Sequence, residues 1–356
     1  MSQPVEKQST RILALDYLRG FFILVIIVDH LFRFPNAFML ISGEARLWMT
    51  AAEGFIMISG LLIGYIRGYK GLKHPFSTIA HTLFRRALLL YVWLIIGSIV
   101  YLGVASWMLN IPSTPSAAVP VGDWWSLITT ILTMQHPAVW VHFLYLYAIF
   151  LVLSIGAVWL YRQQKAWLIA AISITLYILG YIHNIEWMKW QLLFFGAAIV
   201  GCYLEPICIW WNSLTKRKAL EWSLYSITVG TLALSIITVY FPHLLPGSIV
   251  ATLQTAFFID TFGPARVVIS ILWFTALCFA FERIYPLLKK YTYGVLEYFG
   301  THSLTAYIAH GAIICLVNAF LPPSDSILIN TLVTFAGIIA VYGFIRIPVV
   351  DKILPR

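Results

Sequence analysis

Apolar residues are grouped along this chain into long runs that short polar segments separate. A helix needs about 17–25 mostly apolar residues to cross the hydrocarbon core of a bilayer. Runs of this length, or nearly so, cover residues 11–32, 48–66, 84–105, 139–161, 166–184, 187–204, 220–241, 264–283, 295–320 and 326–348. The pattern predicts an all-α, polytopic bundle of about ten spans over residues 11–348, between polar tails at 1–10 and 349–356.

Lysine and arginine are concentrated in alternate loops between these runs. The clusters are Lys7/Arg11, Arg67/Lys70/Lys73/Arg85/Arg86, Arg162/Lys165, Lys216/Arg217/Lys218, Arg283/Lys289/Lys290 and Arg346/Lys352/Arg356. With ten spans every cluster falls on one side, as the positive-inside rule requires, and both termini are cytoplasmic. If the short apolar piece 124–134 also crossed, all later clusters would move outside. We therefore expect 124–134 to be a re-entrant or surface helix on the outer face.

Composition agrees with a lipid environment. Hydrophobic residues make up 61% of the chain and charged residues 10%, and the mean hydropathy is +0.87, whereas soluble domains carry roughly 25% charged residues. The loop clusters account for the net charge of +9, so no nucleic-acid partner is expected. The four cysteines have no metal-ligand spacing, and we expect no bound metal and no disulfide. The sequence contains no evident internal repeat, so a transporter built from inverted repeats is not supported.

The first apolar run contains four ionisable residues, which are costly inside a membrane and therefore informative: Asp16, Arg19, Asp29 and His30. Arg19 and His30 are eleven positions apart. On a helix this separation is a rotation within ~20° of three full turns, so the two side chains share one face, and the rise between them is ~16 Å. Gly20 beside Arg19 leaves room for a ligand or a neighbouring backbone. Alternatively, Asp16 and Arg19 form an i,i+3 ion pair that only neutralises a buried charge, and His30 is an interfacial histidine.

The same topology places further polar side chains at the outer depth of the membrane. With the two from the first run they are Asp29, His30, Glu53, His142, Gln191, Arg266 and His310, and Trp190 adjoins Gln191. Their shared depth predicts a hydrophilic outer cavity, although His142 can equally be a simple interfacial residue. Gly60 and Gly64 form a small-xxx-small pair, which indicates close helix packing.

Several motifs resemble one family of membrane enzymes. The run LDYLRGFFILVIIVDH, with ten residues between Arg19 and His30, resembles the opening signature of the membrane acyltransferase 3 superfamily. AAEGFIMISGLLIGY and FRRALLLY resemble its second and third helices, and GTHSLTAYIAHG its late Gly-x-x-Ser…Tyr…His motif. HFLYLYAIFLVL, WQLLFFGAAIVG and FGPARVV are most similar to the branch that succinylates osmoregulated periplasmic glucans. The related heparan glucosaminide N-acetyltransferases share a similar opening run.

This resemblance implies an integral protein of the bacterial cytoplasmic membrane. Its donor is acyl-CoA from the cytoplasm, with acetyl or succinyl as the acyl group, and its acceptor is a glycan or lipid-linked sugar on the outer side. No other cofactor is expected. Arg85 and Arg86, which open a helix, are candidates for binding the CoA phosphates, whereas Arg67, Lys70 and Lys73 are interpreted as topogenic charge.

The resemblance also suggests catalytic roles. A neutral His30 can take the proton of an acceptor hydroxyl as general base. A carboxylate can orient this imidazole; Asp29 points ~100° away on the helix, which leaves Glu53 as the better candidate. Arg19 or a second histidine can stabilise the thioester oxyanion. The pattern leaves open an acyl-histidine intermediate.

The remaining outer polar residues are predicted to bind substrate: His142, Trp190, Gln191, Arg266 and His310. Three other functions stay open at this point, namely an amino-sugar N-acetyltransferase, a transporter or flippase of a lipid-linked sugar, and a non-catalytic membrane partner. The identity of the acyl group, the acceptor and the oligomeric state also stay open.

Overall fold

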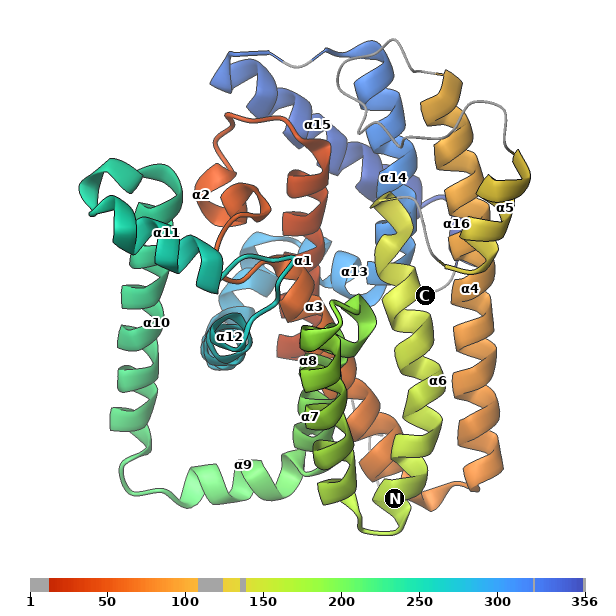
Figure 1. Cartoon of the computed structure of the whole chain (residues 1–356), viewed down its shortest axis with the longest axis vertical. Helices are drawn as coiled ribbons and strands as arrows, with labels where there is room; N and C mark the ends of the chain where they lie inside the picture. The colour runs from red at the N-terminus through yellow and green to blue at the C-terminus, as the bar shows by residue number, and fades with distance from the viewer. Residues whose placement is uncertain (1–12, 108–123, 135–138, 323, 355–356) are drawn as a thin grey trace, which may run out of the picture.

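A computed structural model describes residues 13–107, 124–134, 139–322 and 324–354, and every regular element in these ranges is helical (Figure 1). The α-helices are α1 (Leu13–Leu31), α2 (Met39–Ser42), α3 (Ala51–Ile63), α4 (Phe76–Trp107), α5 (Trp124–Leu132), α6 (His142–Arg162), α7 (Ala166–Ile182), α8 (Glu186–Cys202), α9 (Leu204–Ser213), α10 (Arg217–Tyr240), α11 (Gly247–Ala256), α12 (Pro264–Tyr291), α13 (Val295–Thr301), α14 (Ser303–Phe320), α15 (Ile327–Ile345) and α16 (Pro348–Ile353). A π-helical turn, Gly64–Tyr69, and a 3-10 turn, Lys70–Lys73, continue α3. The predicted all-α class is confirmed.

Within the described residues, six helices are long and apolar enough to cross a membrane, and counting each of two bent pairs as one span raises the number to eight. The bent pairs are α8 with α9, at 71°, and α13 with α14, at 98°. Each of the ten predicted runs contains a helix. However, α1 carries Asp16, Arg19 and Asp29, and α7 has only 17 residues. Length and composition therefore identify six to eight candidate spans in the described residues, and the count of ten stays a prediction.

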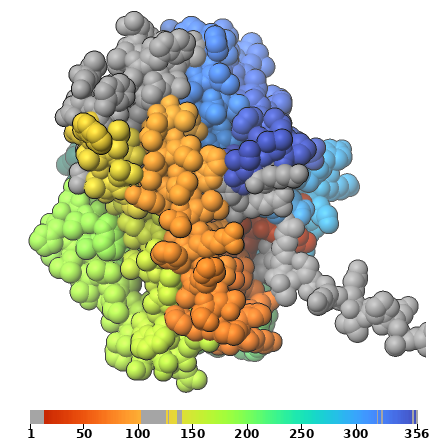
Figure 2. Space-filling model, turned by 90° about the vertical axis from the view of Figure 1, so that its right-hand side faces the viewer, coloured from red at the N-terminus to blue at the C-terminus, as the bar shows by residue number. Residues whose placement is uncertain are grey.

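The long helix α4 presents an apolar surface on the outside of the bundle. Figure 2 shows it running down one face of the molecule. Leu88, Val92, Ile96 and Ile99 on this helix are all more than 40% exposed. A stripe of exposed branched side chains over several turns is typical of a surface that lipid chains cover.

Glycines allow the helices of the core to approach closely. A Cβ atom on Gly60 would lie 2.1 Å from the carbonyl oxygen of Phe194, and one on Gly64 would lie 1.9 Å from that of Ala198. The backbones of α3 and α8 therefore touch at these positions, as small residues at a membrane helix interface permit. This contact confirms the interpretation of Gly60 and Gly64 as a packing pair.

Helix α1 occupies the centre of the bundle and packs against α3, α12, α13, α14 and α15 (Figure 1). Its contact with α13 also depends on glycine. A Cβ on Gly20 would lie 2.0 Å from the Leu296 carbonyl oxygen, and one on Gly300 would lie 1.8 Å from that of Asp16. The space predicted beside Arg19 is thus filled by a neighbouring backbone.

The predicted run 295–320 is not one straight span. It breaks at His302, which ends α13 and begins α14 with φ −114° and ψ 30°, and the two helices meet at 98°. Apolar composition alone does not reveal this break, because both helices are apolar. Its consequence is that α13 and α14 contact different parts of α1.

The short piece 124–134 forms the nine-residue helix α5. The hydroxyl of Tyr91 on α4 donates to the Leu132 carbonyl at 2.7 Å, so the end of α5 is held against α4. The predicted tail 1–10 lies outside the described residues, as does most of the loop 106–123. The predicted tail 349–356 overlaps α16, and its last two residues also lie outside them.

Candidate active site

Two histidines from distant parts of the sequence meet at the centre of the bundle. His30 lies in the last turn of α1, and His310 lies in the middle of α14. His30 Nδ1 is 2.7 Å from His310 Nε2, and the ring centroids are 5.0 Å apart. His310 is fully buried, whereas His30 is partly exposed. Of the two residues, only His30 retains exposed surface.

Hydrogen bonds assign the tautomer of each ring. His310 Nδ1 bonds to the backbone carbonyl of Tyr307, which can only accept, so this nitrogen carries the hydrogen. In a neutral His310, Nε2 is then the acceptor, and it must receive the bond from His30 Nδ1–H. The lone pair of a neutral His30 is consequently at Nε2. His310, which is held by the Tyr307 carbonyl, thus fixes the tautomer of His30, in the way that a carboxylate fixes the histidine of a catalytic triad.

Tyr307 connects the histidine pair to the neighbouring helix α6. Its ring centroid is 4.9 Å from that of His310 and 6.4 Å from that of His30. Its hydroxyl accepts a hydrogen bond from the Phe143 N–H at 3.2 Å. Because this N–H belongs to the first turn of α6, the bond also satisfies a donor without a partner inside its own helix.

A cavity of about 170 Å³ lies between α1, α3, α4, α6 and α14. Three arginines from different helices line it: Arg19, Arg67 and Arg86. Its lining, drawn entirely from the described part of the chain, contains no Asp or Glu. Three guanidinium groups in one wall make this cavity suited to an anion with more than one negative charge.

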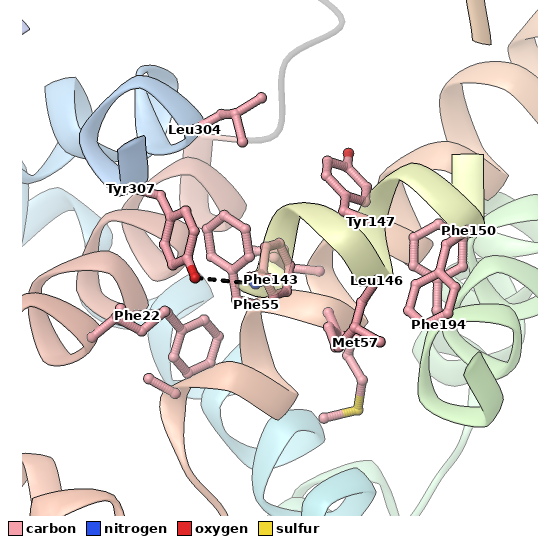
Figure 3. Packing of buried hydrophobic residues seen from close by; sticks show 14 of the residues in the cluster. Phe22, Phe55, Met57, Phe143, Leu146, Tyr147, Phe150, Phe194, Leu304 and Tyr307 are labelled. Atoms are coloured by element: carbon pink, nitrogen blue, oxygen red, sulfur yellow. Dashed lines mark hydrogen bonds between the residues drawn. The ribbon is translucent and has the colours of Figure 1, made fainter. Parts of the chain in front are cut away.

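The rings of Phe55, Phe143, Tyr147 and Tyr307, all labelled in Figure 3, form an aromatic layer that extends from the cavity lining to His310. Phe55 and Tyr147 line the cavity, and the ring of Phe143 lies 5.0 Å and 5.8 Å from theirs, between centroids. On its other side Phe143 lies 5.5 Å from Tyr307, again between centroids. Phe143 and Tyr307 thus connect the cavity lining to the histidine pair.

One face of helix α14 contributes a residue to the cavity, to the aromatic layer and to the histidine pair, in this order along the chain. Ser303 lines the cavity, Tyr307 belongs to the aromatic layer and His310 to the histidine pair. These positions follow the i, i+4, i+7 spacing of one helical face, and seven residues rise about 10 Å. On α1, Arg19 donates to the Gly300 carbonyl at 3.4 Å while His30 bonds to His310. The shared face predicted for Arg19 and His30 is therefore the face toward α13 and α14.

A family described as OpgC protein matches residues 11–348, which contain every residue of this site. The chain belongs to the OpgC family. Membership indicates a membrane acyltransferase that acts on glucans. No curated protein and no solved structure matches the chain.

In this OpgC-family chain, Glu53 and Arg266 meet as a buried ion pair, with 2.6 Å between Glu53 Oε1 and Arg266 Nε. The other oxygen of Glu53 accepts from the Thr50 N–H at 3.0 Å, which completes a capping box at the start of α3. Arg266 also donates to the Phe257 carbonyl at 2.6 Å. Glu53 is thus bonded within this cluster, and the side chain bonded to His30 is that of His310 rather than Glu53.

The other predicted substrate-binding residues of the OpgC-family chain lie in separate contacts. His142 Nε2 forms a hydrogen bond with the Glu186 carboxylate at 2.9 Å, and both side chains are partly exposed. Gln191 donates to the Ser173 carbonyl at 2.8 Å, which ties α8 to α7. The Trp190 ring packs 4.4 Å from that of Phe262, between centroids.

The seven residues predicted for one outer cavity are therefore divided among separate partners, and none of them lines the arginine cavity. Asp29 is buried, and its Oδ1 has no hydrogen-bond partner among the described residues. Of the two arginines predicted to bind CoA phosphates, Arg86 lines the cavity, whereas Arg85 is exposed on α4 and lies outside the lining.

Two residues of the site, Arg67 and Tyr307, had no predicted role, although Tyr307 is the tyrosine of the Gly-x-x-Ser…Tyr…His motif. Arg67 was interpreted as topogenic, yet it reaches the cavity from the π-helical turn Gly64–Tyr69. Such turns occur frequently at functional sites, but no sequence pattern marks them. Tyr307 had a usable signal, because it shares a helical face with Ser303 and His310.

Proposed function

We propose that this OpgC-family protein transfers an acyl group, succinyl or acetyl, from cytoplasmic acyl-CoA to a glucan hydroxyl on the outer side of the membrane. One observation carries the proposal. A single face of α1 has Arg19 in a three-arginine cavity and, ~16 Å further along, His30 with an available Nε2. A site for a polyanionic donor and a base are thus aligned along one helix.

The cavity holds part of the donor. Ligand pockets commonly measure about 300–1,000 Å³, so 170 Å³ is too small for a whole acyl-CoA. Arg67 and Arg86 contact its phosphates, and the narrow pantetheine arm extends past Arg19 toward the aromatic layer. This assignment keeps Arg86 as a phosphate ligand, adds Arg67 and leaves Arg85 outside the site.

The histidine pair activates the acceptor. A glucan hydroxyl donates its proton to His30 Nε2 as its oxygen attacks the thioester carbon. The positive charge that forms on His30 is stabilised by the Nδ1–H bond to His310 Nε2. When the tetrahedral intermediate collapses, the C–S bond breaks and the proton passes from His30 to the thiolate, which leaves an ester and free CoA.

The proposed topology has ten crossings with both termini in the cytoplasm, because this arrangement places the basic clusters inside. The arginine cavity then opens toward the cytoplasm and the histidine pair lies toward the outside. Single cysteines at Ser213 and Asp325, both exposed, test this orientation in a cysteine-free background. An impermeant thiol reagent added outside should label position 325 and spare 213; labelling of 213 would overturn it.

Transfer itself is tested with proteoliposomes that enclose radiolabelled succinyl-CoA or acetyl-CoA and have glucan outside. The expected result is label on the external glucan that mild base releases, as an ester requires. Base-stable label would indicate N-acylation of an amino sugar. Movement of sugar across the membrane without acyl transfer would instead identify a transporter.

A further inference from the structure

The proposed reaction needs a hydrogen-bond donor for the oxyanion that develops on the thioester oxygen, and the histidine pair does not supply one. His310 Nδ1–H is bonded to the Tyr307 carbonyl, and His310 Nε2 accepts from His30. His30 Nε2 is the base. Arg19 lies ~16 Å away along α1. Neither oxyanion donor suggested by the sequence, Arg19 or the second histidine, is therefore suitably placed.

Tyr307 has the required properties. Its side chain is 3% exposed and lies in the aromatic layer between the arginine cavity and His30. The hydroxyl oxygen accepts from the Phe143 N–H at 3.2 Å, which fixes its position. Among the described residues no acceptor is bonded to its hydrogen, so the O–H is available to donate.

The Phe143 N–H also makes the hydroxyl a better donor. Hydrogen bonds in series polarise one another, so an N–H that donates to the phenol oxygen strengthens the bond which the phenol O–H then makes. This N–H lies in the first turn of α6, where the partial positive charge of the helix end adds to the effect. The donor is held in place before the reaction, as electrostatic stabilisation of an oxyanion requires.

We propose that Tyr307 is a catalytic residue. Its hydroxyl donates a hydrogen bond to the thioester carbonyl oxygen as this oxygen becomes an oxyanion. The inference rests on the proposed acyl transfer. The acceptor oxygen forms a bond to the carbonyl carbon, and the C=O π electrons move to the oxygen that faces Tyr307. His30 takes the acceptor proton. Collapse restores the C=O bond and expels the CoA thiolate, which regains that proton; Tyr307 keeps its own proton throughout.

Tyr307→Phe removes the hydroxyl and retains the ring. Loss of one oxyanion donor typically lowers kcat by about 10²–10³-fold, so we expect a fall of at least about 100-fold with an unchanged Kd for CoA. Tyr101→Phe is the matched control, because Tyr101 is also buried and donates to the Ile308 carbonyl at 2.8 Å. It should retain most of the wild-type kcat.

A second measurement separates catalysis from packing in case Tyr307→Phe is misfolded. Fluorotyrosine incorporated at position 307 keeps the hydroxyl and the bond from Phe143 while making the phenol a more acidic donor. We expect kcat to change progressively with phenol acidity at position 307 and to stay constant for the same series at position 101. A purely structural hydroxyl would give no trend at either position.

The inference is overturned if Tyr307→Phe keeps kcat within about threefold of the wild type, or if the fluorotyrosine series is flat. A loss of kcat matched by an equal loss at Tyr101→Phe would also overturn it. A failure of the proposed function gives a different result, because the wild-type protein itself would then transfer no acyl group from either donor.

Discussion

Replacement of His310 tests whether this residue orients the base or is the base. His310→Ala removes the acceptor of the 2.7 Å bond from His30 Nδ1. In the transition state this bond is charge-assisted, because His30 has gained a proton. A hydrogen bond to a charged group contributes about 1.5–3 kcal/mol, and each 1.36 kcal/mol is tenfold in rate. We therefore expect kcat to fall by about 10- to 150-fold.

A conservative variant makes this prediction sharper. In His310→Gln the side-chain amide oxygen can take the place of Nε2 and accept from His30 Nδ1–H. We expect this variant to recover part of the rate that His310→Ala loses. The assay is single-turnover transfer from succinyl-CoA to glucan in nanodiscs, with thermal unfolding measured in parallel. The reasoning is refuted if both variants are inactive although folded, since His310 would then be the base.

The remaining predictions concern the donor cavity, the buried ion pair and the aromatic layer. Arg86→Gln should raise the KM for acyl-CoA by about tenfold or more through the loss of a charge-assisted bond, whereas Arg85→Gln should leave it unchanged; equal effects would place the phosphates elsewhere. Arg266→Met leaves the Glu53 carboxylate buried without its partner, which should lower stability by about 3–5 kcal/mol; Glu53→Gln in the same chain should restore part of the loss, and an unaltered melting temperature would contradict this role. Phe143→Ala should open the aromatic layer and raise hydrolysis of acyl-CoA measured without acceptor; an unchanged rate would show that this ring does not seal the cavity.

Helical periodicity in the sequence predicted the contacts of α1. Arg19 and His30 share a face because eleven residues make nearly three turns, and the structure shows that face toward α13 and α14. The glycine pair Gly60 and Gly64 likewise predicted a close helix contact. These features depend on the position of residues within one helix, which the sequence gives directly.

Pairing between helices was less predictable. Depth in the membrane suggested that Glu53, His142 and His310 share one cavity, yet each has a different partner. Residues at one depth can face different neighbours around the bundle, and the sequence does not give the rotation of one helix against the next. The same reason explains why Arg67 was interpreted as topogenic.

The most direct test of the central claim, that His30 is the base for acyl transfer, is single-turnover transfer by His30→Ala and His30→Gln. The enzyme is reconstituted with radiolabelled succinyl-CoA inside the vesicles and glucan outside. Loss of a general base commonly costs 10²–10⁴-fold, so His30→Ala should insert normally and transfer at least about 100-fold more slowly. His30→Gln should be nearly as slow, because it keeps a polar group but not a base. Near-normal transfer by a correctly inserted His30→Ala protein would contradict the account.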